Sequence, residues 1–185
     1  MTAVIDLLWK LCLLRVGPER MPTAGLFVAL VVIANLTISA LVAITSPYGA
    51  DALDAISAPV IGAAVLATGT WLMLLAKGMS ERFVATFTAL MGADVIITLI
   101  SWPVIVMTRP GETDAWQFLL ALVQFALLFW WITVSGFVFA RALDVSRIQG
   151  VAVAVFVVLT TLLVTASVFP PPGVEAASGA TTART

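Results

Sequence analysis

The stretch Phe83–Met107, FVATFTALMGADVIITLISWPVIVM, contains one charged residue, Asp94, among apolar and small side chains. An α-helix rises about 1.5 Å per residue and the hydrocarbon layer of a bilayer is about 30 Å thick, so this stretch is long enough to cross a membrane. A helix on the surface of a soluble protein would instead carry polar residues along one face. The stretch therefore predicts a membrane-spanning helix with an acidic residue near its middle.

Four further apolar stretches without any charged residue surround it, separated by short connectors that carry Gly, Pro, Asp or Ser. They run from Thr23 to Thr45, from Ile56 to Ala76, from Ala115 to Ala140 and from Ile148 to Phe169. Because backbone polar groups in lipid must be satisfied within each helix, we expect an all-α integral membrane bundle of five transmembrane helices over residues 21–169. Residues 170–185 are rich in Ala, Ser, Thr and Gly, which predicts a disordered external tail.

The composition excludes several classes of protein. Of the 185 residues, 62% are hydrophobic and 10% are charged, whereas an ordinary soluble domain carries about a quarter charged residues. The net charge of −1 leaves no basic excess to bind nucleic acid. With no histidine and a single cysteine, the usual metal clusters, nucleophile pairs and intramolecular disulfides are also excluded. We therefore expect no catalytic residues, no cofactor, no metal and no nucleic-acid partner.

The basic residues predict the orientation of the bundle. With a cytoplasmic N-terminus, the outer side receives only Arg109 and Arg184. The inner side then receives Lys10, Arg15, Arg20, Lys77, Arg82, Arg141 and Arg147. This asymmetry follows the positive-inside rule, so we expect a cytoplasmic N-terminus and, after five spans, an external C-terminus.

Residues 1–20 are predicted to form an amphipathic interfacial helix. Asp6 and Lys10 are four residues apart and share one helix face, while apolar side chains cover much of the rest. We interpret this helix as an anchor for the edge of the bundle, and the alternative is a helix that binds a dedicated partner. Cys12 is interpreted as a small apolar side chain, with acylation as the alternative.

Asp94 needs polar partners, because an ionised carboxylate at the bilayer midplane costs about 2.5–3.5 kcal/mol. Thr98 and Ser101 follow it at four and seven residues, which predicts a polar stripe on one helix face. Asn35 and Gln124 are expected at similar depth in the first and fourth spans. We therefore predict one intramembrane polar cluster of these five residues, in which Asp94 is a neutral acid that donates a hydrogen bond to an amide oxygen.

Two interpretations of this polar cluster stay open. The cluster either fixes helix register, with about 0.6 kcal/mol from each interaction, or lines a path for protons or solutes. We favour the first, because one carboxylate without a neighbouring His, Lys or second acid makes a poor relay. Small residues over 62–69 predict close contacts that place the second span inside the bundle, and Ser135-Gly136 is predicted to be a packing site.

The middle and end of the chain, over residues 22–169, resemble the Yip family, the Ypt/Rab-interacting membrane proteins and their bacterial relatives. The resemblance rests on WLMLLAKGMSERF at Trp71–Phe83, on Thr88–Ala93 followed by Ser101-Trp102-Pro103, and on Trp130-Trp131 through Arg141–Arg147. The cytosolic N-terminal region of eukaryotic members, with its Asp-Leu-Tyr-Gly-Pro-like motif, is replaced here by Arg15–Glu19. The resemblance therefore implies a bacterial inner-membrane member that carries no catalytic residues.

These observations together predict a non-enzymatic, multi-pass inner-membrane protein that acts as a scaffold or adaptor. The alternative is a small transporter or channel component that uses the polar cluster around Asp94. Expected partners are the lipid bilayer and other membrane proteins or a second copy of the chain. A membrane enzyme is disfavoured, because no pair of ionisable residues converges at one depth.

Overall fold

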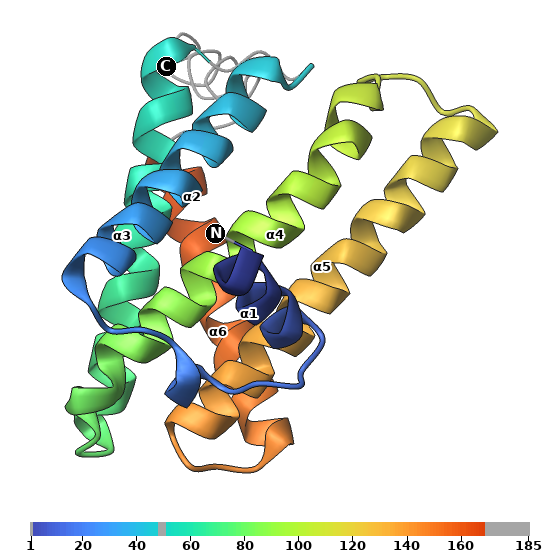
Figure 1. The fold of residues 1–185 in the computed structure, drawn as a ribbon. Helices are drawn as coiled ribbons and strands as arrows, with labels where there is room; N and C mark the ends of the chain where they lie inside the picture. Colours follow the sequence, from blue (N-terminus) through green and yellow to red (C-terminus); the bar gives the residue numbers. More distant parts are fainter. Residues whose placement is uncertain (1, 48–50, 169–185) are drawn as a thin grey trace, which may run out of the picture.

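The structure is a computed structural model that describes residues 2–47 and 51–168. Every regular element in these residues is a helix (Figure 1). In chain order the elements are α1 (Thr2–Cys12), the 3-10 helix η1 (Pro18–Arg20), α2 (Gly25–Thr45), α3 (Ala52–Ala76), the 3-10 helix η2 (Ser80–Arg82), α4 (Phe83–Met107), α5 (Ala115–Ala142) and α6 (Arg147–Val168). The predicted tail over 170–185, and Phe169 at the predicted end of the last span, lie outside the described residues.

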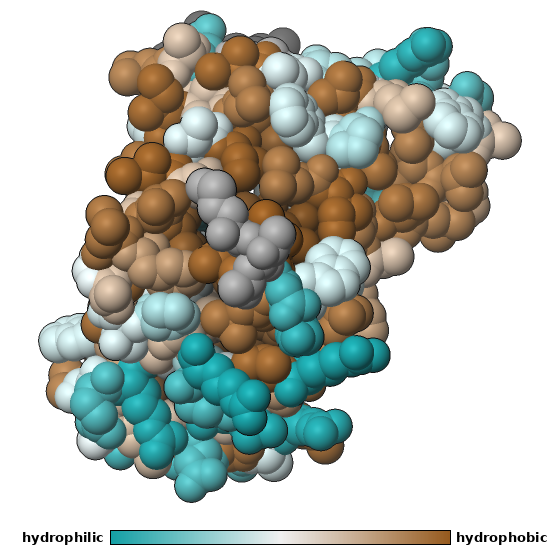
Figure 2. All heavy atoms as spheres, in the orientation of Figure 1, coloured by the Kyte–Doolittle hydropathy of each residue, from teal (hydrophilic) through white to brown (hydrophobic). Residues whose placement is uncertain are grey.

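The described residues include five helices that are long and apolar enough to cross a membrane, namely α2, α3, α4 with η2, α5 and α6. This confirms the predicted all-α bundle of five spans. Large apolar side chains point outward from it, such as Phe129 on α5 and Leu163 on α6, which are 73% and 74% exposed. Figure 2 shows this apolar surface as a broad band, with polar residues gathered at the lower end of the molecule and at its upper right corner. Such a band is the surface that lipid covers.

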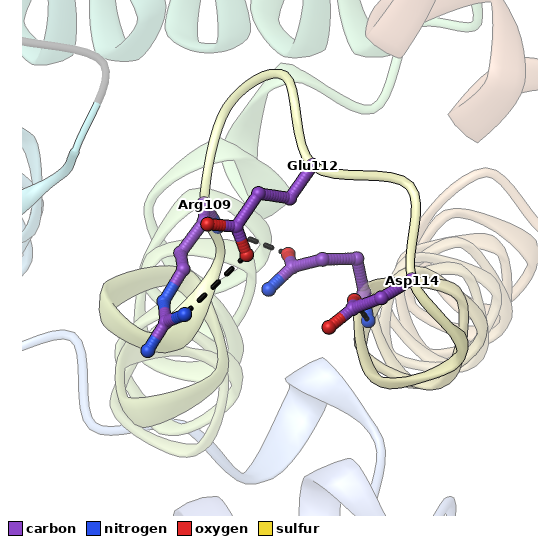
Figure 3. A network of polar contacts seen from close by, with 4 residues as sticks. Arg109, Glu112 and Asp114 are labelled. Atoms are coloured by element: carbon purple, nitrogen blue, oxygen red, sulfur yellow. Dashed lines mark hydrogen bonds and ion pairs between the residues drawn. The ribbon is translucent and has the colours of Figure 1, made fainter.

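The connection between α4 and α5 lies at the upper right corner and is held by polar contacts (Figure 3). The Asp114 side chain caps α5 by accepting a hydrogen bond from the backbone N–H of Gln117 at 2.8 Å. The Gln117 side-chain oxygen in turn accepts from the backbone N–H of Arg109 at 2.9 Å. An exposed ion pair of 3.4 Å joins Arg109 to Glu112. These contacts fix where α5 begins.

The centre of the bundle is the middle of α4. Every residue over 88–93 is buried, and consecutive positions point in all directions around a helix, so neighbours surround this part of α4 on every side. Those neighbours are α1, α2, α3 and α5. The second span, α3, packs against α2, α4 and α6. Its small residues Gly62 and Gly69 face α6, while Leu53 and Leu72 on α3 are exposed.

Helices α5 and α6 approach each other closely at two glycines. A Cβ added to Gly150 would overlap the carbonyl oxygen of Gly136 and would lie 2.7 Å from the Ala140 backbone nitrogen. A Cβ added to Gly136 would lie 2.8 Å from the Val151 Cα. Glycine is therefore required at both positions, since any side chain would push the two helices apart. The predicted packing site at Ser135-Gly136 is this crossing.

The N-terminal helix α1 packs against α4 and α5 near the middle of their lengths (Figure 1). The Leu8 side chain occupies the space that a side chain at Gly92 of α4 would need. The Trp130 indole of α5 donates a hydrogen bond to the Cys12 carbonyl oxygen at 2.9 Å, and its ring meets Trp9 edge to face. The ion pair of Asp6 and Lys10 lies on the exposed face. The apolar face of α1 therefore covers protein.

Cys12 provides a direct test of how firmly α1 is packed. Its thiol is 1% exposed, and burial raises its pKa from 9.0 to about 11. A raised pKa keeps the thiol protonated, so at neutral pH it carries about a hundredfold less thiolate than an ordinary cysteine. We expect maleimide to label Cys12 at least tenfold more slowly than an exposed cysteine at pH 7.5.

The matched control is Leu13→Cys in a Cys12→Ser background, because Leu13 is the next residue and is 42% exposed. Labelling rates are read by mass spectrometry on protein in lipid nanodiscs. Equal rates at the two positions would mean that α1 is not packed on α4 and α5 as described. Slow labelling also argues against acylation of Cys12 in this folded state.

Candidate functional site

The carboxylate of Asp94 joins three helices. On α4 it accepts a hydrogen bond from the Asn35 side-chain amide of α2 at 2.8 Å and another from the Trp131 indole N–H of α5 at 2.7 Å. The same Asn35 nitrogen also donates to the Met91 carbonyl oxygen at 3.3 Å. Both carboxylate oxygens of Asp94 therefore act as acceptors. The prediction that Asp94 donates to an amide oxygen is wrong, because the amide presents its nitrogen to two acceptors.

The depth of these groups explains why they meet. Asp94 lies eleven positions after Phe83, where α4 begins, and Trp131 lies eleven positions before Ala142, where the antiparallel helix α5 ends. Asn35 lies ten positions after the start of α2. Since all three helices rise about 1.5 Å per residue from the same end of the bundle, their polar groups reach the same level.

Gln124 is the one predicted hydrogen-bond partner of Asp94 that does not bond to it. It lies seven positions before Trp131, which places it about 10 Å further along α5. The depth estimate from the sequence was wrong because α5 has 28 residues and its mid-depth lies further from its start than in a span of ordinary length. Gln124 is exposed and makes no hydrogen bond with another described residue.

All five residues of the predicted polar cluster nevertheless line one cavity of about 360 Å³. Its walls come from α2, α3, α4, α5 and α6. Asp94 and Asn35 lie at one part of this lining, with Ser101 buried and Thr98 half-buried on the same face of α4. The Ser101 hydroxyl donates to the Thr98 carbonyl oxygen at 3.0 Å. The rest of the wall is mainly apolar, as Leu66, Ile97, Leu127, Val157 and Leu162 illustrate.

The lining of the cavity limits the chemistry that it can support. Asp94 is the one ionisable side chain among the described residues that line it. No group of three or more His, Cys, Asp and Glu side chains comes together within 2–47 and 51–168, so this part of the chain presents no metal-ligand cluster. A lone carboxylate between neutral N–H donors can attract and orient a positive or hydrogen-bonding group. It cannot supply a general acid and a general base at once.

Sequence reasoning missed Trp131 as a site residue. The sequence signal was present, because Asp94 lies 12 positions after Arg82 and Trp131 lies 10 positions before Arg141, in the two basic connectors at the same end of the bundle. An indole carries one N–H donor and no acceptor, so a tryptophan at the level of an intramembrane carboxylate is a natural partner for it.

A second pocket lies at the polar end of the bundle where α4 begins and α5 ends. It is a groove of about 730 Å³ between the N-terminal segment, the start of α4, the end of α5 and the start of α6. Arg141 pairs with Glu19 at 3.4 Å and lies over the Phe137 ring at 5.4 Å. Arg82 donates to the Ala142 carbonyl oxygen at 3.2 Å. The remaining charged residues of the lining are Glu81, Asp144 and Arg147.

Comparison of the chain with protein-family models, with curated protein sequences and with solved structures gives no match.

Proposed function

We propose that the chain is a non-enzymatic scaffold or adaptor of Yip-like type in the inner membrane of a bacterium. Its N-terminus is cytoplasmic and its C-terminus is periplasmic. This orientation is supported by the connectors that carry Lys77, Arg82, Arg141 and Arg147 at one end of the bundle, against Arg109 at the other. Its partners are the lipid bilayer and other membrane proteins.

The groove at the basic end is the observation that supports the scaffold. It joins four separate segments of the chain into one surface through the Glu19–Arg141 ion pair and the Arg82–Ala142 hydrogen bond. Its lining mixes arginines and acidic side chains, which suits a partner segment that carries both charges. Such a surface exists only when the bundle is folded, because its parts come from segments that are far apart in the chain. A scaffold that binds another protein needs a surface of this kind.

Photocrosslinking in living cells tests this function. With a photoreactive amino acid at Val145, which lines the groove, we expect a discrete adduct with one membrane protein. A probe at Thr113, in the loop between α4 and α5, should not give this adduct. Arg141→Glu opposes two negative charges at Glu19 and should reduce the Val145 adduct at least severalfold.

The matched control is Arg109→Glu, which reverses the charge in the ion pair with Glu112 at the other end of the bundle. It should leave the adduct at Val145 unchanged, because neither Arg109 nor Glu112 lines the groove. The same adduct from both probe positions, or none from Val145, would contradict the scaffold function.

A second candidate function is a small transporter or channel component. The observation that favours it is the gathering of Asp94, Asn35 and Gln124 around one cavity. Intramembrane ionisable residues commonly mark a path for ions or substrates.

A further inference from the structure

The Asp94 carboxyl group has no positive partner among the described residues, and at membrane depth its ionised form is stable only beside a positive group. Its two hydrogen-bond donors, Asn35 and Trp131, are both neutral. The donor distances are 2.8 and 2.7 Å, so both oxygens of the carboxyl group accept a well-formed hydrogen bond and neither donor brings a charge. No Lys or Arg side chain takes part in the described lining of the cavity. Buried charges in proteins are paired, so the cavity is complementary to a cation from outside the chain.

The rest of the cavity indicates what kind of cation it accepts. Its volume of about 360 Å³ is within the range of small-molecule sites, about 300–1,000 Å³. Apolar side chains such as Leu66, Ile97 and Val157 form most of its wall. A small hydrated inorganic ion would leave that apolar wall in contact with water. An organic cation with an apolar body fills the same space without this cost.

One aromatic ring and one amide group in the lining also suit an organic cation. The Trp131 ring lies in the lining next to the carboxylate that its N–H binds, and an indole face attracts cations. The Gln124 side chain also lines the cavity and has no hydrogen-bond partner in the described chain. An unpaired amide at membrane depth is costly, so its oxygen and nitrogen are available to a ligand.

We propose that this cavity binds a lipophilic organic cation, whose positive centre pairs with Asp94 and whose apolar body lies against the walls from α3, α5 and α6. This inference rests on the second candidate function, and it names the class of substrate that such a transporter would take. The proposed cation site does not depend on the groove at the basic end of the bundle.

Binding of tetraphenylphosphonium tests the proposal. This permanent cation is measured by equilibrium dialysis against the full chain in lipid nanodiscs, with empty nanodiscs subtracted because the cation also enters lipid. We expect saturable binding that Asp94→Asn weakens by about tenfold or more, as for the loss of a charge-assisted contact. Tetraphenylborate, an anion of the same shape, should show no saturable binding.

Matched variants separate the effect of the Asp94 charge on binding from an effect on folding. Asp54→Asn removes a carboxylate in the first turn of α3 that lies outside both this cavity and the groove, and should leave binding unchanged. If Asp94→Asn fails to fold, Leu162→Trp tests the cavity instead, because Leu162 lies in its wall. Leu163→Trp is the control for that variant, since Leu163 is the next residue and lies outside the lining of the cavity.

Equal binding by the unchanged protein and a folded Asp94→Asn variant would overturn the proposal, as would equally tight binding of tetraphenylborate. If Asp94→Asn does not fold, unchanged binding by Leu162→Trp would overturn it. Flux of a neutral solute in proteoliposomes without cation binding would support transport but refute this substrate class. Cation binding without flux would support the site and refute transport.

Discussion

Replacement of Gly150 by alanine is expected to destabilise the bundle by about 1–3 kcal/mol, as overpacking of a filled core does. The added Cβ would overlap the Gly136 carbonyl oxygen and would lie 2.7 Å from the Cβ and the backbone nitrogen of Ala140. Backbone atoms cannot rotate away, so α5 and α6 must separate. Gly136→Ala should have a similar effect through Val151. Thermal unfolding of the purified protein in detergent measures both changes.

Gly62→Ala and Gly69→Ala are the matched controls for this prediction. A Cβ at Gly62 would lie 3.8 Å from the Thr161 Cγ2, and one at Gly69 would lie 3.8 Å from the Val157 Cγ2. These are ordinary contacts, and alanine favours a helix by about 0.8–1.0 kcal/mol over glycine. We therefore expect the controls to be neutral or stabilising. Similar losses at all four glycines would contradict the described crossing of α5 and α6.

Replacement of Trp131 by phenylalanine is expected to cost about 1.5–3 kcal/mol, the range for a hydrogen bond to a charged group. It removes the N–H that binds one oxygen of Asp94 at 2.7 Å and leaves the carboxylate with Asn35 as its described donor. The neighbouring Trp130→Phe removes a similar N–H at 2.9 Å, but its acceptor is the neutral Cys12 carbonyl. We expect that change to cost about 0.5–1.5 kcal/mol.

A double-mutant cycle isolates the carboxylate in this comparison. In an Asp94→Asn background, Trp131→Phe should cost only about 0.5–1.5 kcal/mol, because the amide oxygen is a neutral acceptor, whereas Trp130→Phe should keep its own cost. Unfolding free energies come from titration with a denaturing detergent. An equal cost for Trp131→Phe with and without the charge would show that Asp94 is not held by Trp131.

The five spans were predictable because their evidence lies within each segment. Length and hydropathy identify a membrane helix whatever it packs against, as Phe83–Met107 illustrates. The order of the helices from centre to edge was not predictable in the same way. Gly62 and Gly69 in α3 and Gly136 and Gly150 in the α5–α6 pair look alike in sequence, and only the distances to neighbouring backbones separate them.

The candidate site was partly predictable for a similar reason. A carboxyl group at membrane depth requires polar partners, and this requirement correctly predicts the contact with Asn35. The partner on α5 depends on the register between two antiparallel helices, and this register follows from the length of α5. Depth counted from the start of α5 selects Gln124, whereas depth counted from its end selects Trp131, the residue that binds Asp94.

The packing of α1 sets an order of events during synthesis. Its contacts lie far ahead in the chain, because Leu8 packs against Gly92 and the Cys12 carbonyl receives its hydrogen bond from Trp130. The ribosome has to complete α4 and most of α5 before these partners exist. Helix α1 is therefore made before α4 and α5 but reaches its final place only after them, and until then its apolar face, with Leu8 and Leu11, needs lipid or a chaperone to cover it.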